Sequence, residues 1–159
     1  DRATSGGGSI DYDGGQFLWP TSGRISAYFK SNDSVHNGNH NGVDIAAPFG
    51  TKIMAISDGV VKEVRNSCPH NYGKYRNCCG NGYGNYVVID HGKDAKGTIY
   101  VAWYAHMQSV AVSVGQTVKR GQIIGYVGST GFSTGAHLHF GLKVNKIWRD
   151  PMLFYTKVK

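Results

Sequence analysis

Apolar and polar residues alternate in short runs along most of the chain, and no stretch keeps a helical period of useful length. Alternation with a period of two is typical of strands that bury one face. Glycine, asparagine and serine separate the runs, as they do at tight turns. We therefore predict an all-β fold with a mostly antiparallel core and little helix. The predicted strands lie within residues 24–29, 42–46, 52–56, 60–64, 86–91, 98–106, 110–127 and 137–144.

The hydrophobic pattern also divides the chain into a lead-in and one domain. Residues 1–16 contain few apolar side chains and many Gly, Ser and Asp, which predicts a flexible lead-in or linker. The domain is expected to occupy residues 17–159, and the glycine-rich opening suggests a module of a larger protein. Within the domain, a turn sequence at 57–59 separates two predicted strands, so we expect residues 52–64 to form a hairpin.

Composition narrows the partners that this domain can have. Its 159 residues include 17 Lys and Arg against 10 Asp and Glu, a formal net charge of +7. Such a charge attracts polyanions, among them nucleic acid, anionic membranes and the acidic polymers of bacterial cell walls. The basic residues form no dense run and no helical stripe, so we do not predict nucleic-acid binding. No apolar stretch approaches the roughly 20 residues that cross a bilayer, so we expect no membrane-spanning segment.

The three cysteines fall in one polar, glycine-rich segment, where two interpretations are open. A disulfide from Cys68 to Cys78 or Cys79 would close a short loop, suit an extracellular protein and leave one thiol over. Alternatively, Cys68 and His70 would belong to a structural zinc site. Because the segment has no C-x-x-C pair, we favour the disulfide.

Candidate chemistry first appears on the strand predicted at 137–144. Successive strand residues point to opposite faces, so His137 and His139 share one face while Leu138 and Phe140 occupy the other. Two neighbouring imidazoles on a rigid strand pack poorly in a core but make a good start for a metal site.

A carboxylate far upstream is the natural companion of these histidines. Val43 and Ile45 flank Asp44 in strand fashion, so Asp44 points away from the side chains that enter the core. A buried carboxylate without a partner costs at least several kcal/mol. A cation would supply that partner, and His40 stands four residues before Asp44.

These residues fit a catalytic zinc site, which uses three protein ligands and keeps a fourth position for water. His40, Asp44 and His139 would supply the ligands, and two imidazoles among three ligands favour zinc over magnesium. His137 lies on the same strand face as His139, close enough to handle a proton or to stabilise an oxyanion.

Three further histidines are interpreted from their surroundings. Alternation places His106 and Tyr104 on one face of their strand, so spacing alone favours a surface histidine held by Tyr104. His36 competes with His40 as a ligand, but the Gly-Val-Asp sequence that follows favours His40. His91 belongs to a turn-like His-Gly pair and is interpreted as structural.

The order of the motifs along the chain carries a family resemblance. H-x-x-x-D at residues 40–44, Y-x-H at 104–106 and H-x-H at 137–139 resemble the motifs of the LytM/lysostaphin-type zinc endopeptidases of bacterial peptidoglycan. Flanking segments are also similar to that family, including G-V-D-I-A-A-P from residue 42 and V-K-R-G-Q-I-I-G from residue 118. The resemblance covers nearly all of the predicted domain.

The resemblance implies one Zn²⁺ per chain, held in a groove of the β core by His40, Asp44 and His139. It assigns His106 and His137 to catalysis, against the surface interpretation of His106, and leaves the division of roles between them open. The implied substrate is a peptide bond of bacterial peptidoglycan, in a stem peptide or a cross-bridge, and the implied location is extracellular or facing the cell wall. The alternative is a catalytically inactive relative that binds the cell wall or a partner protein.

Two segments depart from the family pattern. Residues 29–31 read Phe-Lys-Ser where members often carry a Phe-Gly-x-Arg-like segment, and the cysteine segment at 66–84 is an unusual insertion near the expected groove wall. Both bear on substrate preference and leave the predicted metal site unchanged. The bond cleaved and the host context, whether autolysin, bacteriocin, phage enzyme, or secretion or conjugation module, stay open.

Overall fold

Strands make up almost all of the regular structure. The computed structural model describes residues 12–13, 17–30, 41–68, 82–131, 133 and 135–157. Within these ranges the helical structure is confined to a 3-10 turn, η1 (Pro151–Phe154). The described part of the chain therefore has no helix of the length and hydropathy needed to cross a bilayer. The prediction of an all-β, mostly antiparallel fold with little helix is confirmed.

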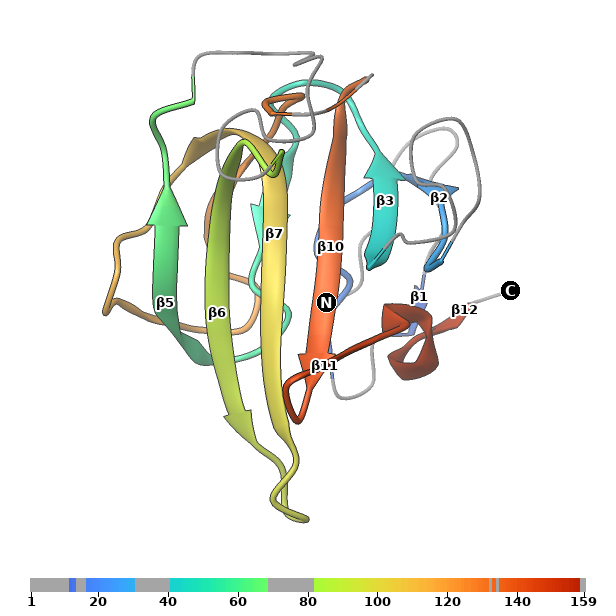
Figure 1. Cartoon of the computed structure of the whole chain (residues 1–159), viewed down its shortest axis with the longest axis vertical. Coiled ribbons are helices and arrows are strands. Elements are labelled where there is room, and N and C mark those ends of the chain that lie inside the picture. Colours follow the sequence, from blue (N-terminus) through green and yellow to red (C-terminus); the bar gives the residue numbers. More distant parts are fainter. Residues whose placement is uncertain are drawn as a thin grey trace.

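One large sheet carries most of the domain (Figure 1). Its strands follow the order β2, β3, β10, β7, β6, β5, β8, and each neighbouring pair is antiparallel. In addition, β11 continues from β10 as a hairpin. The bounds are β2 (Arg24–Ala27), β3 (Gly42–Ala46), β5 (Gly59–Arg65), β6 (Asn85–Lys93), β7 (Ile99–Val110), β8 (Thr117–Val118), β10 (His137–Val144) and β11 (Ile147–Arg149).

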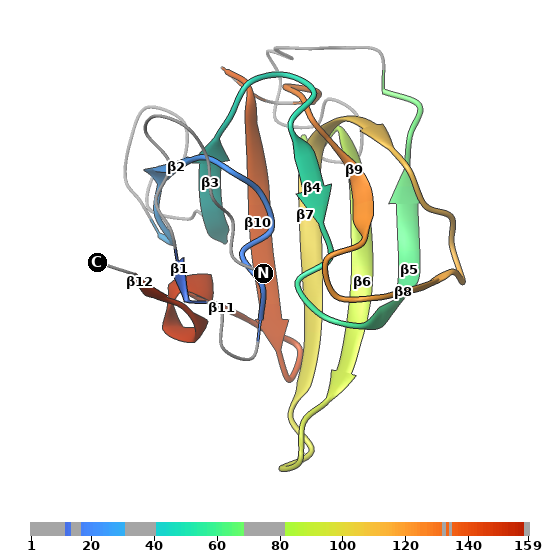
Figure 2. The same cartoon turned by 180° about the vertical axis from the view of Figure 1, so that it is seen from behind.

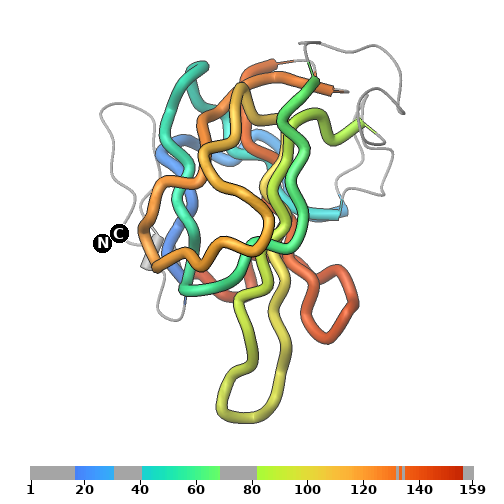
Figure 3. Tube along the Cα trace, turned by 90° about the vertical axis from the view of Figure 1, so that its left-hand side faces the viewer, coloured from blue at the N-terminus to red at the C-terminus, as the bar shows by residue number. Residues whose placement is uncertain are grey.

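A short second layer covers one face of this sheet. It consists of β4 (Lys52–Met54) paired with β9 (Ile123–Val127), and β9 also pairs with the end of β7. Figure 2 shows β4 and β9 in front of β6 and β7, and Figure 3 shows the two layers from the side. Apart from these layers, β1 (Tyr12–Asp13) pairs with β12 (Thr156–Lys157) as a separate two-stranded sheet.

The main hydrophobic core fills the space between the two layers. Ile53 of β4 and Ile124 of β9 are fully buried there, against fully buried side chains of β3, β6, β7 and β10. Trp19 from the segment before β2 and Tyr155 after η1 pack edge-to-face at a ring-centroid distance of 4.9 Å and extend this core toward β10. Burial of this apolar surface is the main stabilising contribution to the fold.

The hairpin expected over residues 52–64 is wrong. β4 pairs with β9 and β5 pairs with β6 and β8, so the two segments belong to different layers. The connection between them is fixed by long-range contacts: the backbone N–H of Ile56 donates to the hydroxyl of Tyr104 at 3.2 Å, and its carbonyl accepts from Leu18 N at 2.8 Å. A turn-like sequence marks the change of direction but does not choose the partner strand.

The other face of the large sheet, which we call the site face, is the face seen in Figure 1. On β10, Leu138, Phe140 and Leu142 are fully buried in the core, so His137 and His139 point to the site face. On β3, Val43 and Ile45 enter the core in the same way, which leaves the carboxylate of Asp44 on the site face. The face assignments predicted for these two strands are confirmed.

Candidate active site

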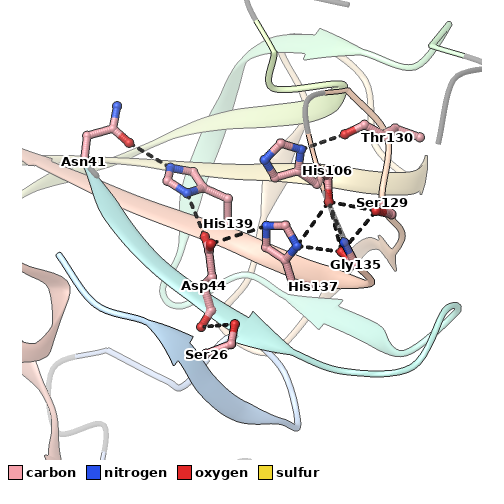
Figure 4. A network of polar contacts seen from close by, with 10 residues as sticks. Ser26, Asn41, Asp44, His106, Ser129, Thr130, Gly135, His137 and His139 are labelled. Atoms are coloured by element: carbon pink, nitrogen blue, oxygen red, sulfur yellow. Dashed lines mark hydrogen bonds and ion pairs between the residues drawn. The ribbon is translucent and has the colours of Figure 1, made fainter. Parts of the chain in front are cut away.

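Antiparallel pairing of β3 and β10 brings the predicted carboxylate to the predicted histidines. His139 lies directly opposite Asp44 in the register. Nδ1 of His139 is 3.1 Å from Oδ1 of Asp44, and Nε2 of His137 is 3.6 Å from Oδ2 of the same carboxylate (Figure 4). Both Asp44 and His139 are only 5% exposed. The buried carboxylate is thus shared between two imidazoles that stand on one strand face.

The second ring nitrogen of His139 is held by a residue that sequence reasoning missed. Nε2 of His139 donates to Oδ1 of Asn41 at 2.8 Å, and Nδ2 of Asn41 donates to the hydroxyl of Tyr83 at 2.7 Å. With its proton on Nε2, His139 turns the lone pair of Nδ1 toward Asp44. The only signal in the sequence was the position of Asn41 directly after His40.

His106 reaches the same site from β7 by an unexpected backbone conformation. Its φ is +59°, in the left-handed region, and its N–H donates to the carbonyl of Tyr83 at 2.8 Å. The ring centroid of His106 is therefore 4.7 Å from that of His137, whereas Tyr104 is fully buried in the core. The expectation that Tyr104 and His106 share a face is wrong, because the left-handed residue interrupts the alternation.

The protonation of His106 follows from its partners. Nδ1 of His106 donates to the carbonyl of Thr130 at 2.6 Å, and Thr130 is fixed by its own hydroxyl, which donates to the carbonyl of Met107 at 2.7 Å. Burial, together with the nearby rings of His137 and His139, lowers the pKa of His106 from 6.5 to about 3. The ring is neutral, and its Nε2 is the nitrogen left to accept a proton.

A loop of small polar residues holds His137. Nδ1 of His137 donates to the carbonyl of Gly135 at 2.7 Å, and the hydroxyls of Ser129 and Ser133 donate to that same carbonyl at 3.0 and 2.9 Å. Ser129 is fully buried and Ser133 is 4% exposed, so these hydroxyls are part of the interior. The sequence identified this stretch only as a loop, and the structure makes it the support of His137.

Several predicted residues lie in segments that the structure does not describe. His40 and the rival ligand His36 lie outside the described residues, as do His70, Cys78 and Cys79. Among the residues that the structure describes, no group of three His, Cys, Asp or Glu side chains is placed to hold a metal. Cys68 is disulfide-bonded, which agrees with a bridge and not with a zinc ligand.

His91 has the structural role that the sequence predicted. Its Nε2 accepts from the hydroxyl of Tyr104 at 2.9 Å, and its Nδ1 lies 3.1 Å from the carbonyl of Asp58. The ring joins β6, β7 and the bend before β5, on the side of the sheet away from Asp44. Burial lowers the pKa of His91 below its usual 6.5.

Fold and site together define a class of protein: an antiparallel β domain whose sheet face carries a buried carboxylate among imidazoles, the donor types of hydrolytic zinc sites. The chain belongs to peptidase family M23, whose sequence model matches residues 38–151. That range contains every histidine and carboxylate predicted to form the site.

Individual relatives agree with this membership. The peptidoglycan DD-endopeptidase ShyA of Vibrio cholerae is 44% identical over 105 residues, which cover 66% of this chain and 20% of that protein. The structure of the catalytic domain of lysostaphin from Staphylococcus simulans matches with a TM-score of 0.61 and 35% identity, over 80% of this chain and 87% of that domain. A zinc-containing peptidase from Vibrio cholerae matches with a TM-score of 0.65 and 33% identity, over 84% of this chain and 38% of the other. The chain thus spans about a fifth of ShyA and most of the lysostaphin catalytic domain.

Proposed function

We propose that this domain is a zinc-dependent endopeptidase that hydrolyses peptide bonds of bacterial peptidoglycan, in a stem peptide or a cross-bridge. The observation that carries the proposal is the cluster of Asp44, His137, His139 and His106 on one sheet face, with each imidazole held through a defined nitrogen. Relatives that bear the names of a peptidoglycan DD-endopeptidase and of lysostaphin support the choice of substrate. Work on this polymer requires an extracellular or wall-facing location, and the positive net charge of the chain suits an anionic wall.

The donor atoms of Asp44 and His139 fit a shared metal ion. Two donors bound to one tetrahedral zinc at about 2.0–2.1 Å are about 3.3 Å apart, and the observed separation of Nδ1 and Oδ1 is 3.1 Å. The lone pair of Nδ1 faces a carboxylate oxygen, an arrangement that a cation between them would stabilise. His40 is proposed as the third ligand. When bound, zinc would lower the pKa of a coordinated water to about 7 and polarise a substrate carbonyl.

His106 and His137 are placed to move protons at this centre. Each donates its Nδ1–H to a backbone carbonyl, of Thr130 and Gly135 respectively, so each keeps Nε2 for the reaction. One ring takes the proton of the attacking water on Nε2 and delivers it to the leaving amine. The other ring donates a hydrogen bond to the developing oxyanion from Nε2 in its imidazolium form, with a proton on both nitrogens. The left-handed backbone of His106 is the kind of strain that proteins retain at functional sites.

The test combines metal analysis with wall lysis, in the presence and absence of a chelator. Asp44→Ala is expected to lose bound zinc and activity together, whereas His106→Ala is expected to retain zinc and lose turnover. Mass spectrometry of the muropeptides released from defined cell walls would then identify the bond. Full activity of the Asp44→Ala protein would overturn the assignment of the site. Zinc and wall binding without hydrolysis in the native protein would favour the inactive-relative alternative.

A further inference from the structure

Four aromatic rings continue the site face away from His139, and we call them the aromatic platform: Tyr83, Tyr86, Trp103 and Trp148. The ring centroid of Tyr83 is 5.7 Å from that of His139 and 5.2 Å from that of Trp103. Trp103 is stacked on Tyr86 at 5.4 Å and meets Trp148 edge-on at 5.8 Å. The rings come from the turn before β6, from β6, from β7 and from β11, and they form an unbroken path that starts at the proposed metal ligand.

The backbone under the platform is built to accept a ring. Gly141 of β10 lies opposite Trp103 of β7 in the register, two residues beyond His139 on the same face. A Cβ on Gly141 would lie 2.6 Å from Cζ3 of Trp148, so only glycine allows the indole to approach the strand this closely. The hairpin of β10 and β11 bends toward the site face (Figures 1 and 3). Trp148 of β11 packs there against Gly141 and Trp103. Trp148 is therefore seated on the sheet rather than projecting from it.

The platform is partly open to solvent, unlike the main core. Tyr83, Trp103 and Trp148 are half-buried. They lie on the site face, whereas β4 and β9 cover the other face of the sheet (Figure 2). A cluster whose only purpose was stability would be expected to bury its indoles more completely, since each ring left in water forgoes hydrophobic stabilisation. Aromatic side chains that stay partly accessible to solvent beside a candidate reactive centre are typical of binding surfaces.

The cation of Lys143 lies at the far end of the platform. Nζ of Lys143 is 4.8 Å from the ring centroid of Trp148 and 5.8 Å from that of Trp103. Within the described residues no carboxylate forms an ion pair with Lys143. Lys143 stands four residues beyond His139 on the same strand face, which is about 13 Å at the usual rise per residue. An extended ligand would span this length with about four peptide units.

Resting on the proposed function, we propose that the aromatic platform binds a sugar ring of the glycan strand, and that Lys143 binds a carboxylate of the peptide attached to it. A pyranose ring presents a flat face of C–H groups that packs on aromatic rings, and a polar rim that needs water or polar side chains. The aromatic platform offers rings on which the C–H face can pack, and Lys143 lies at the edge of the platform, where it can meet polar groups. The separation from His139 suits a substrate in which a short peptide joins the sugar to the bond that is cleaved. The polymer would thus be held at two points: at the site around His139, where the bond is cleaved, and at the aromatic platform, where the sugar is recognised.

The test compares two substrates and two variants. Trp148→Ala removes the ring seated on Gly141, and Ile147→Ala is the matched control, because Ile147 precedes it on the same strand and is 54% exposed. For each protein, the rate on intact peptidoglycan is divided by the rate on a peptide of the same sequence without sugar. We expect this ratio to fall about tenfold in Trp148→Ala, the loss of one good aromatic contact, and to stay unchanged in Ile147→Ala. Melting curves check that both variants fold.

A direct binding measurement separates this proposal from the proposed function. Binding of an N-acetylglucosamine oligomer is followed by the tryptophan fluorescence of the native protein, of Trp148→Ala and of Lys143→Gln. Because this oligomer carries no carboxylate, Lys143→Gln should bind it as the native protein does. Saturable binding that Trp148→Ala weakens would support the platform even if the native protein cleaved neither substrate, a result that would overturn the proposed function alone. Absence of saturable binding, or equal rate losses on both substrates, would overturn the platform. A change of oligomeric state in Trp148→Ala would also overturn it, because the rings would then bind a second copy of the chain.

Discussion

Replacing Asn41 with alanine removes the acceptor that holds Nε2 of His139 at 2.8 Å. The imidazole can then rotate and exchange its tautomer, because no acceptor holds the proton on Nε2 and keeps the lone pair of Nδ1 toward Asp44. Side chains that orient a metal-binding histidine in this way typically contribute 10–100-fold to metal affinity, roughly 1.4–2.7 kcal/mol. A buried donor left without a partner costs a similar amount, about 1–3 kcal/mol. We therefore expect the zinc dissociation constant to rise by about one to two orders of magnitude.

The measurement is a competition titration of zinc against a chromophoric chelator, with native protein and variant at equal concentration. Tyr83→Phe is a graded control, because it removes only the hydroxyl that accepts from Asn41 and leaves the Asn41–His139 contact in place. Asn66→Ala is a matched control, because Asn66 accepts from the backbone N–H of Val110 at 2.9 Å in an exposed region and does not touch the site. The expected order of zinc affinity is native and Asn66→Ala highest, Tyr83→Phe next, and Asn41→Ala lowest.

Two results would refute this reasoning in different ways. If Asn41→Ala bound zinc as tightly as the native protein, Asn41 would be a neighbour of His139 without a role in orienting it. If Asn41→Ala and Asn66→Ala lost affinity equally, the effect would be one of general stability. A native protein that did not bind zinc at all would instead contradict the proposed metal site.

Three further predictions concern the stability of the scaffold. Gly141→Ala should lower the free energy of unfolding in urea by about 1–3 kcal/mol, because its Cβ would lie 2.6 Å from the ring of Trp148. Tyr104→Phe should lower it by about 1–3 kcal/mol, because the N–H of Ile56 and Nε2 of His91 both lose a buried partner. Burial holds the pKa of His91 below 6.5. Below about pH 6.5 the unfolded chain therefore binds a proton at His91 more readily than the folded chain does. The contribution of His91 to the free energy of unfolding should be constant above about pH 6.5 and should fall on acidification below it. Urea titrations at several pH values should show a smaller decline in His91→Gln.

Site residues could be placed from the sequence where local strand geometry decides which way the side chain points. The period of two in a strand is a local property, so the apolar residues Leu138 and Phe140 were enough to place His137 and His139 together on the other face. The same reasoning failed at His106, because a φ of +59° turns its side chain out of the alternation. No glycine marks that position, and a left-handed non-glycine residue leaves no trace in the hydrophobic pattern.

The sequence pattern did not predict which distant strands pair with each other. The runs before and after residues 57–59 looked like a hairpin, yet β4 pairs with β9, which lies much later in the chain. Such pairing is decided by which faces the whole sheet must bury, a property of the assembled fold. For the same reason Asn41 and Tyr83 escaped notice: each is an ordinary polar residue until the register of β3 and β10 places His139 beside them.

The two histidines of β10 differ in which nitrogen the protein holds, and this difference supports the roles proposed for them. His139 is held through Nε2 by a side-chain amide and presents Nδ1 to Asp44, whereas His137 is held through Nδ1 by a backbone carbonyl and presents Nε2. Nδ1 lies close to the backbone, so a ligand using it is fixed by the strand itself, as a metal site requires. Nε2 lies at the tip of the ring and is the nitrogen that the proposed acid–base role would use. Under the proposed function, one strand face thus supplies a fixed metal ligand and a catalytic imidazole two residues apart.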